Sequence, residues 1–354
     1  MIRSISLRHV LVLAVTASLP SCAATSPSAP PSDEVLLVVN STEQSLSVVP
    51  VENPGAGIKI PLGPATANAT PVGVSAANGI AIVPLGVVSA VAVVDLKLGT
   101  VPRIIPLEAN SGATGSAVVD DSIAYVANPN LNTVTRVNYL TGDTASVAVG
   151  VYPQGVVFTR GKVFVLNGNL VNFAVAGESW ITVIDPTTNA KASGTDSIGL
   201  QPPGNAGFAD VAAFDGLMYV MSTGGFNPGD LGRLSVVDPV TRVELANFGG
   251  FGNAPQAVAA GGDRLYISSF SEGLMVFDIA KNKVIHGAGD GVPIMLNAGV
   301  AVDSKGRIYA LDLGPCSGGI AGKAHVLDAS LNEKNTITLG ECPSGALVTF
   351  VPPS

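Results

Sequence analysis

Short apolar runs alternate with tight-turn residues along the chain, and the same four-part pattern recurs about every 40 to 55 residues. Each copy holds an apolar strand, a second strand after a tight turn, a third strand that usually ends in aspartate, and a variable fourth strand. This pattern predicts a four-stranded antiparallel blade. The first strands of the seven copies are predicted over Pro71 to Ala77, Ala113 to Val119, Pro153 to Thr159, Phe208 to Phe214, Pro255 to Gly261, Asn297 to Asp303 and Pro343 to Val351.

The two ends of the repeat array are complementary. Six first strands lead through a turn pair such as Asn78-Gly79 into a second strand, but the copy at Pro343 to Val351 ends the chain. An unmatched second strand, Val35 to Asn40, stands at the other end. The sequence therefore predicts an all-β, seven-bladed β-propeller whose ring is closed by pairing of the N- and C-terminal strands, which leaves no open edge.

The aspartates that end the third strands are expected to be structural. They are followed by turn residues such as Pro186-Thr187-Thr188, and the backbone N–H groups of the threonines can donate to the carboxylate. Asn138 and Pro50 replace the aspartate in two copies. The five aspartates are Asp95, Asp185, Asp238, Asp278 and Asp328.

The copy over Tyr125 to Gly155 reads YVANPNLNTVTRVNYLTGDTASVAVGVYPQG. It resembles the YVTN-type repeat of bacterial surface and periplasmic propellers in its YVAN strand, NTV strand, TGD turn and closing VGxxPxG. The repeat length matches that family over the whole domain, whereas the residues themselves match closely in this copy alone. It implies a fold and no particular activity.

Composition agrees with this fold and excludes some partners. Apolar residues make up 47% of the 354 residues and charged residues 12%, with a net charge of -8. The chain lacks the positive charge that neutralises phosphates, so we expect no nucleic-acid partner. After the leader no apolar run reaches the roughly 20 residues that a membrane helix needs. We expect a monomer.

The N-terminus resembles a bacterial export signal. Arg3 and Arg8 precede an apolar stretch, and Leu19-Pro20-Ser21-Cys22 resembles a lipobox, which implies cleavage before Cys22 and lipidation of that cysteine. A plain cleaved signal peptide is the alternative. The predicted organisation is a signal peptide over 1–21, a Ser/Pro-rich linker over 22–33 and the propeller over 34–354. We expect the protein in the cell envelope, where the lipid alone would anchor it to the periplasmic or the outer side of the outer membrane. Secretion is the alternative.

Cys316 and Cys342 are the cysteines of the propeller region. In an exported protein such a pair is expected to be oxidised to a disulfide. A metal site built on two thiolates is the alternative, but no histidine spacing supports it.

Loop length predicts a ligand face on one side of the disc. Second-to-third connections lengthen over 166–179, 221–232 and 311–322, and the fourth-to-first connection over 198–207 ends on the same face. Long neighbouring loops on a rigid scaffold favour binding, although tolerated insertions would look the same. The predicted ligand-face residues are Asn128, Asn167, Asn169, Trp180, Asp210, Asn227, Asp230, Glu272 and Asp312.

Two functions are compatible with these residues. The first is a non-catalytic binding or scaffold propeller that recognises a protein, peptide or glycan through its long loops. The second is a calcium-dependent hydrolase, lactonase or lyase over the central channel, because carboxylates and amides are calcium ligands. Six-bladed lactonases use such a set, whereas this chain predicts seven blades. No catalytic residue is assigned, because no Ser/His/Asp set can be assembled from three histidines. No metal ligand is assigned and no cofactor is predicted, although calcium is possible.

The lipobox leads to a direct test. If Cys22 carries the lipid, Cys22→Ala removes the attachment point and moves the protein from the membrane fraction to the soluble fraction, as read by fractionation and immunoblotting. Unchanged membrane retention of the variant would contradict lipidation at this residue.

Overall fold

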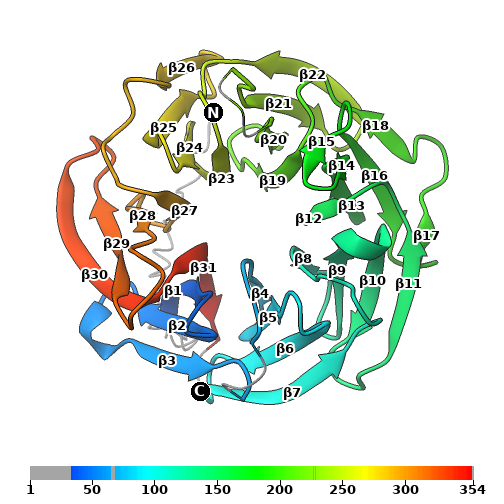
Figure 1. The fold of residues 1–354 in the computed structure, drawn as a ribbon, viewed down its shortest axis with the longest axis horizontal. Coiled ribbons are helices and arrows are strands. Elements are labelled where there is room, and N and C mark those ends of the chain that lie inside the picture. Colours follow the sequence, from blue (N-terminus) through cyan, green and yellow to red (C-terminus); the bar gives the residue numbers. More distant parts are fainter. Residues whose placement is uncertain (1–32, 65–67, 226, 228, 353–354) are drawn as a thin grey trace, which may run out of the picture. The chain divides into compact units, whose positions relative to one another are not determined.

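The structure, a computed structural model, describes residues 33–64, 68–225, 227 and 229–352. The predicted signal peptide, Cys22 and the linker as far as residue 32 lie outside the described residues. The described chain forms seven antiparallel sheets arranged as a ring around a central axis (Figure 1). Its only helical segments are two 3-10 turns, Pro54–Ala56 and Pro129–Leu131. The predicted all-β, seven-bladed propeller is confirmed.

Each blade is a sheet, and its strands are ordered from the axis outward, with the first strand innermost. Blade 1 is β31 (Pro343–Val351), β1 (Asp33–Asn40), β2 (Ser45–Pro50) and β3 (Ile58–Pro61); blade 2 is β4 (Ser75–Ala77), β5 (Ile80–Pro84), β6 (Ala90–Asp95) and β7 (Thr100–Pro106). Blade 3 is β8 (Ser116–Val118), β9 (Ile123–Asn128), β10 (Thr133–Asn138) and β11 (Thr144–Ala148); blade 4 is β12 (Pro153–Thr159), β13 (Lys162–Asn167) and β16 (Trp180–Asp185), with β17 (Ala190–Lys191) and β18 (Ser197–Gly199) outermost. Blade 5 is β19 (Ala206–Val211), β20 (Met218–Ser222), β21 (Arg233–Asp238) and β22 (Val243–Phe248). Blade 6 is β23 (Pro255–Gly261), β24 (Arg264–Ser269), β25 (Gly273–Asp278) and β26 (Lys283–His286); blade 7 is β27 (Asn297–Val302), β28 (Ile308–Asp312), β29 (Ala321–Leu327) and β30 (Glu333–Glu341).

The ring is closed by the two ends of the domain, as the sequence predicts. Strand β1 pairs antiparallel with β31, from Asp33 opposite Val351 to Val39 opposite Gly345. The backbone N–H of Ser41 then donates to the carbonyl of Cys342 at 2.9 Å. Blade 1 therefore exists only when both chain ends are in place.

Most strands fall where the repeat pattern predicts them, but the first strand of blade 5 does not. It was expected over Phe208 to Phe214, and the structure places β19 earlier, over Ala206–Val211. Its hairpin is longer because Asp215 accepts the backbone N–H of Leu217 at 3.0 Å and the hydroxyl of Tyr219 at 2.7 Å. These bonds hold residues 212–217 in the turn.

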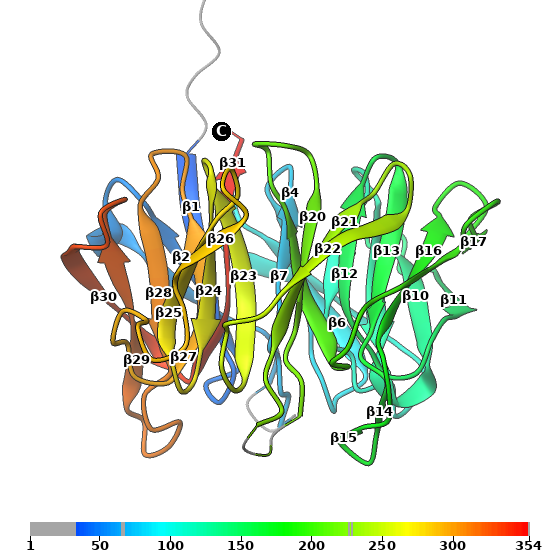
Figure 2. The same cartoon turned by 90° about the horizontal axis from the view of Figure 1, so that it is seen from above.

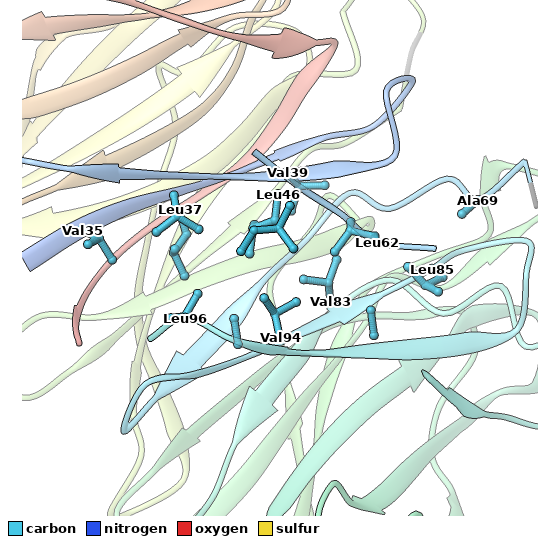
Figure 3. Packing of buried hydrophobic residues seen from close by; sticks show 14 of the residues in the cluster. Val35, Leu37, Val39, Leu46, Leu62, Ala69, Val83, Leu85, Val94 and Leu96 are labelled. Atoms are coloured by element: carbon cyan, nitrogen blue, oxygen red, sulfur yellow. The ribbon is translucent and has the colours of Figure 1, made fainter. Parts of the chain in front are cut away.

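Both faces of each blade are buried. Along β1, the side chains of Val35, Leu37 and Val39 pack against blade 2, as Figure 3 shows. The alternate residues Leu36 and Val38 pack against blade 7. One such apolar cluster lies at each of the seven blade interfaces. This two-sided burial explains why the strands read as continuous apolar runs rather than alternating ones.

At a recurring position of the inner strands, five of the seven blades carry a glycine on which a Cβ would be crowded, whereas blades 5 and 6 carry Phe208 and Ala257 there. A Cβ on Gly155 would lie 2.4 Å from the carbonyl oxygen of Gly207 in the next blade, and a Cβ on Gly345 would lie 2.5 Å from that of Val72. These distances are below van der Waals contact, so a side chain would push adjacent blades apart. We call the recurring glycines the glycine collar: Gly73, Gly115, Gly155, Gly299 and Gly345.

The third-strand aspartates cap the outer turns, which confirms the structural role predicted for them. Asp238, for example, accepts the backbone N–H groups of Val240 at 2.8 Å and Thr241 at 3.3 Å. At Asp185, hydrogen bonds from the hydroxyl and backbone N–H of Thr187 lower the carboxyl pKa to about 2. These bonds favour the ionised form.

The predicted disulfide is present between Cys316 and Cys342, with Cα atoms 4.6 Å apart. It joins the second-to-third loop of blade 7 to the connection that enters β31. It therefore fastens the last blade to the strand that closes the ring.

The glycine collar predicts that two Gly→Ala substitutions differ strongly in their effect on the free energy of unfolding. Gly155→Ala lowers the free energy of unfolding by about 1–3 kcal/mol, because its Cβ meets the backbone of the next blade. Gly199→Ala is the matched control, since a Cβ there meets nothing within 4 Å. Denaturant titration of both variants tests this, and equal stability of the two would contradict the steric role of the collar.

The disulfide predicts a loss of stability on its removal. It closes a loop with a sequence separation of 26 residues. On the chain-entropy account, Cys316→Ala together with Cys342→Ala lowers the free energy of unfolding by about 3–4 kcal/mol. Chemical denaturation under oxidising conditions measures the loss, and an unchanged midpoint would show that the bond does not stabilise the ring.

Candidate functional site

The connections divide between the two faces of the ring. The hairpins from first to second strand and the turns from third to fourth strand lie on one side, which we call the short-turn face. The second-to-third loops and fourth-to-first connections lie on the other, the long-loop face (Figure 2). In this view the hairpin of β14 and β15 projects on the long-loop face, and the end of β31 lies on the opposite side.

The longest structured loop, in blade 4, folds into a small hairpin. Strands β14 (Leu170–Val171) and β15 (Ala174–Val175) pair, and the side-chain amide of Asn169 donates to the carbonyl of Glu178 at 2.9 Å. Phe173 stands at the tip with 72% of its surface exposed, and its ring lies 6.1 Å from that of Tyr152, edge to face. The loop is thus a defined structure that presents an apolar tip.

Exposed large apolar side chains continue from this hairpin along an arc over blades 4 to 7. Met295, in the connection from blade 6 to blade 7, is the most exposed at 77%. Three of them, Phe270, Met295 and Leu296, line one hollow, and contiguous apolar exposure marks interaction surfaces more often than isolated residues do. The members of this apolar arc are Val171, Phe173, Leu231, Phe270, Met295, Leu296 and Ile320.

Charge is distributed unequally between the two faces. Among the described residues, every lysine and arginine lies in a strand or on the short-turn face, and none lies in a connection of the long-loop face. The connections of the long-loop face instead carry carboxylates. These are Glu43, Glu108, Glu178, Asp230, Glu272 and Asp290.

Four of the predicted ligand-face residues do lie in these connections. Asn169 orders the blade 4 hairpin, and the side-chain amide of Asn227 donates to the carboxylate of Asp230 at 3.1 Å in the loop of blade 5. Glu272 lies in the second-to-third turn of blade 6. These residues belong to the same arc as the apolar side chains.

Asn128 and Asn167 are instead buried within the fold. The side-chain oxygen of Asn167 accepts the backbone N–H of Gly150 at 2.9 Å, and its amide donates to the hydroxyl of Thr182 at 3.0 Å. Asn128 donates to Thr135 in the same way, at 2.8 Å. These amides fasten the end of a second strand and do not reach the surface, which corrects their expected position on the ligand face.

Trp180 and Asp312 are half-buried at the base of their loops. A Cβ on Gly150 would lie 2.4 Å from Cζ2 of Trp180, so the indole packs directly against that glycine. Asp312 accepts the backbone N–H of Gly314 at 3.0 Å, and its carboxylate lies 3.9 Å from Nε2 of His325. Both side chains are engaged in shaping the loops.

Asp210 lies in β19, the innermost strand of blade 5, rather than among the loops where it was expected. Its carboxylate accepts the backbone N–H groups of Ala260 in the next blade and of Val211, each at 2.8 Å. Burial raises the pKa of this carboxyl group, although both hydrogen bonds oppose the shift. Asp210 therefore joins the inner edges of β19 and β23.

The predicted acidic candidates are not brought together. Within the described residues, no group of three His, Cys, Asp or Glu side chains is placed to hold a metal ion. In the same part of the chain, no helix is long and apolar enough to cross a membrane.

The mouth of the central channel forms a small cavity of about 250 Å³, lined by the inner strands of all seven blades. Its polar lining is uncharged: Thr114, Ser116, Gln154 and Ser344 contribute hydroxyl and amide groups. Thr114 donates to the carbonyl of Gln154 at 2.9 Å, and the hydroxyls of Ser116 and Ser75 lie 2.8 Å apart. Much of the polar lining thus serves to join neighbouring blades.

A second, larger hollow of about 530 Å³ lies on the apolar arc. We call it the blade 6 groove; it is formed by Phe270–Gly273 and by residues 289, 291 and 293–296. Sequence reasoning missed it. The available signal was the run Val292-Pro293-Ile294-Met295-Leu296, an apolar segment that fits none of the predicted strands.

Comparison with known proteins agrees with the fold. No protein-family model matches the sequence, and no curated protein matches it significantly. Among solved structures 1314 chains match significantly, so the architecture is widespread and does not by itself specify an activity. One of them, from Kuenenia stuttgartiensis hydrazine synthase, superposes with a TM-score of 0.63 over 80% of this chain and 96% of that chain, at 14% identity. Such a likeness shows the fold alone: the chain is a seven-bladed β-propeller.

Proposed function

We propose that this protein is a non-catalytic binding propeller of the cell envelope that recognises a protein or peptide through its long-loop face. One observation carries the proposal. Exposed apolar side chains lie there together with carboxylates, and the connections of the face, as far as they are described, hold no lysine or arginine, which distinguishes it from the short-turn face.

The chemistry of the face indicates the kind of partner. Apolar side chains such as Phe173 and Met295 supply contact area that water disfavours. Glu43 pairs with Lys59 at 2.6 Å and Asp290 lies 3.2 Å from His286, but the other carboxylates of these connections are in no ion pair of the described chain. Such unpaired carboxylates attract a basic partner and disfavour an acidic one. A neutral glycan would gain little from this acidity, so a segment carrying apolar and basic residues fits best.

The channel supports a non-catalytic role. Its mouth is lined by hydroxyls, an amide and apolar groups, and the carboxylate of Asp210 already accepts two backbone N–H groups. General acid–base or nucleophilic catalysis needs a titratable group within reach of a bound substrate.

The position of the chain entry supports a role at the envelope. The first described residue, Asp33, pairs with Val351 on the short-turn face. A lipid on Cys22 would therefore be joined to the propeller through chain that enters on the short-turn face and not through the long-loop face. The YVTN-type resemblance of Tyr125 to Gly155 is in keeping with such a surface or periplasmic protein.

Charge reversal tests the proposal. A synthetic amphipathic peptide of lysine and leucine serves as the probe, with fluorescence anisotropy as the readout. Glu178→Lys together with Asp230→Lys raises its Kd by about tenfold, because each reversal removes an attraction and adds a repulsion.

The matched control has the same change in net charge on the other face. Asp121→Lys together with Asp263→Lys, on the short-turn face, leaves the Kd within about twofold of the parent. An equal loss of binding in both variants would show that net charge alone attracts the probe, and would overturn the assignment of the long-loop face.

A further inference from the structure

The blade 6 groove has a carboxylate fixed within its lining. The Oε2 atom of Glu272 accepts the backbone N–H of Gly289 at 2.8 Å, and its own backbone N–H donates to the hydroxyl of Ser269 at 3.2 Å. A Cβ on Gly252 would lie 2.5 Å from Oε1, so the preceding connection packs against the carboxylate. None of the ion pairs in the described chain involves Glu272. Its negative charge is held in place without a cation.

The opposite wall of the groove is also fixed by backbone contacts. The connection from blade 6 to blade 7 exchanges two hydrogen bonds with β25, between Val292 and Leu274, at 2.8 and 3.0 Å. A Cβ on Gly291 would lie 2.0 Å from the carbonyl oxygen of Glu272, so only glycine permits this approach. The groove is therefore formed before a partner arrives.

The rim of the groove is apolar and exposed. Phe270 is 39% exposed, Leu296 40% and Met295 77%, while Ile294 is buried beneath them. Methionine is flexible and polarisable, so it adapts to different apolar side chains. An aromatic ring and a carboxylate in one groove also suit a guanidinium, because the guanidinium pairs with the carboxylate and stacks on the ring.

From this arrangement we infer that the blade 6 groove is the specificity pocket of the long-loop face and binds a partner segment in which an arginine adjoins a large apolar residue. The arginine pairs with Glu272 and the apolar residue packs between Phe270 and Met295. This inference rests on the proposed function, because it names the part of the face that selects the partner.

The test compares two short capped peptides that differ at one position. The first contains leucine, arginine and leucine, and the second replaces arginine with citrulline, its neutral isostere. Isothermal titration with the purified domain measures both affinities. The parent protein binds the arginine peptide at least about tenfold more tightly than the citrulline peptide.

Two conservative variants locate this preference. Glu272→Gln keeps an acceptor for the N–H of Gly289 but removes the charge, so the preference for arginine falls to about twofold or less while the melting temperature is unchanged. Glu108→Gln, which removes a carboxylate from another connection of the same face, keeps the preference. Met295→Ser weakens both peptides alike, because it removes apolar contact.

Other outcomes overturn the inference in distinguishable ways. A preference that survives Glu272→Gln but is lost in the Glu178→Lys and Asp230→Lys variant places recognition elsewhere on the long-loop face, so the groove assignment fails and the proposed function stands. If the preference is lost only in the Asp121→Lys and Asp263→Lys variant, both the groove assignment and the proposed function are overturned. No binding of either peptide at about 1 mM, or self-association of the domain at the groove, overturns the groove assignment.

Discussion

The close approach of seven inner strands around one axis is the constraint on which the structure depends. Where Gly155 meets the backbone of Gly207, and where Gly345 meets Val72, adjacent blades are in backbone contact and a single methyl group would separate them. This constraint explains the recurring Pro-x-Gly phrase better than a turn preference does. Where the glycine collar is present it permits this close spacing, and apolar clusters fill the interfaces between the blades.

Closure decides which surfaces remain for function. Both faces of each blade are buried, the inner edges line a narrow channel, and the chain ends are paired in blade 1. The connections are therefore the parts of the sequence least tied to the core. Both faces expose apolar and acidic residues, but the described cations stay in strands or on the short-turn face. Such segregation is not required by the fold, which is why we assign it to recognition.

The sequence predicts the blade number, the seam and the disulfide because each depends on a repeating local pattern or on cysteine spacing. The sequence does not predict which polar side chains are exposed to solvent and which are buried in hydrogen bonds within the fold. Asn128 and Asn167 look like loop amides, but both are buried: Asn167 accepts a hydrogen bond from Gly150 in the neighbouring connection, and Asn128 donates to Thr135 of its own blade. Asp210 was misplaced because β19 starts earlier than its turn residues indicate, and its carboxylate bonds to the next blade. The blade 6 groove depends on packing between a turn and a connection that are about 20 residues apart, which no local pattern reveals.

The central claim is that the long-loop face is the binding surface, and hydrogen–deuterium exchange with and without a bound lysine and leucine peptide tests it most directly. The account predicts slower exchange within the connections at 168–179, 223–232 and 287–296, with the outer strands and the short-turn face unchanged. Protection confined to the short-turn face, or to outer strands such as β22 and β26, would contradict it.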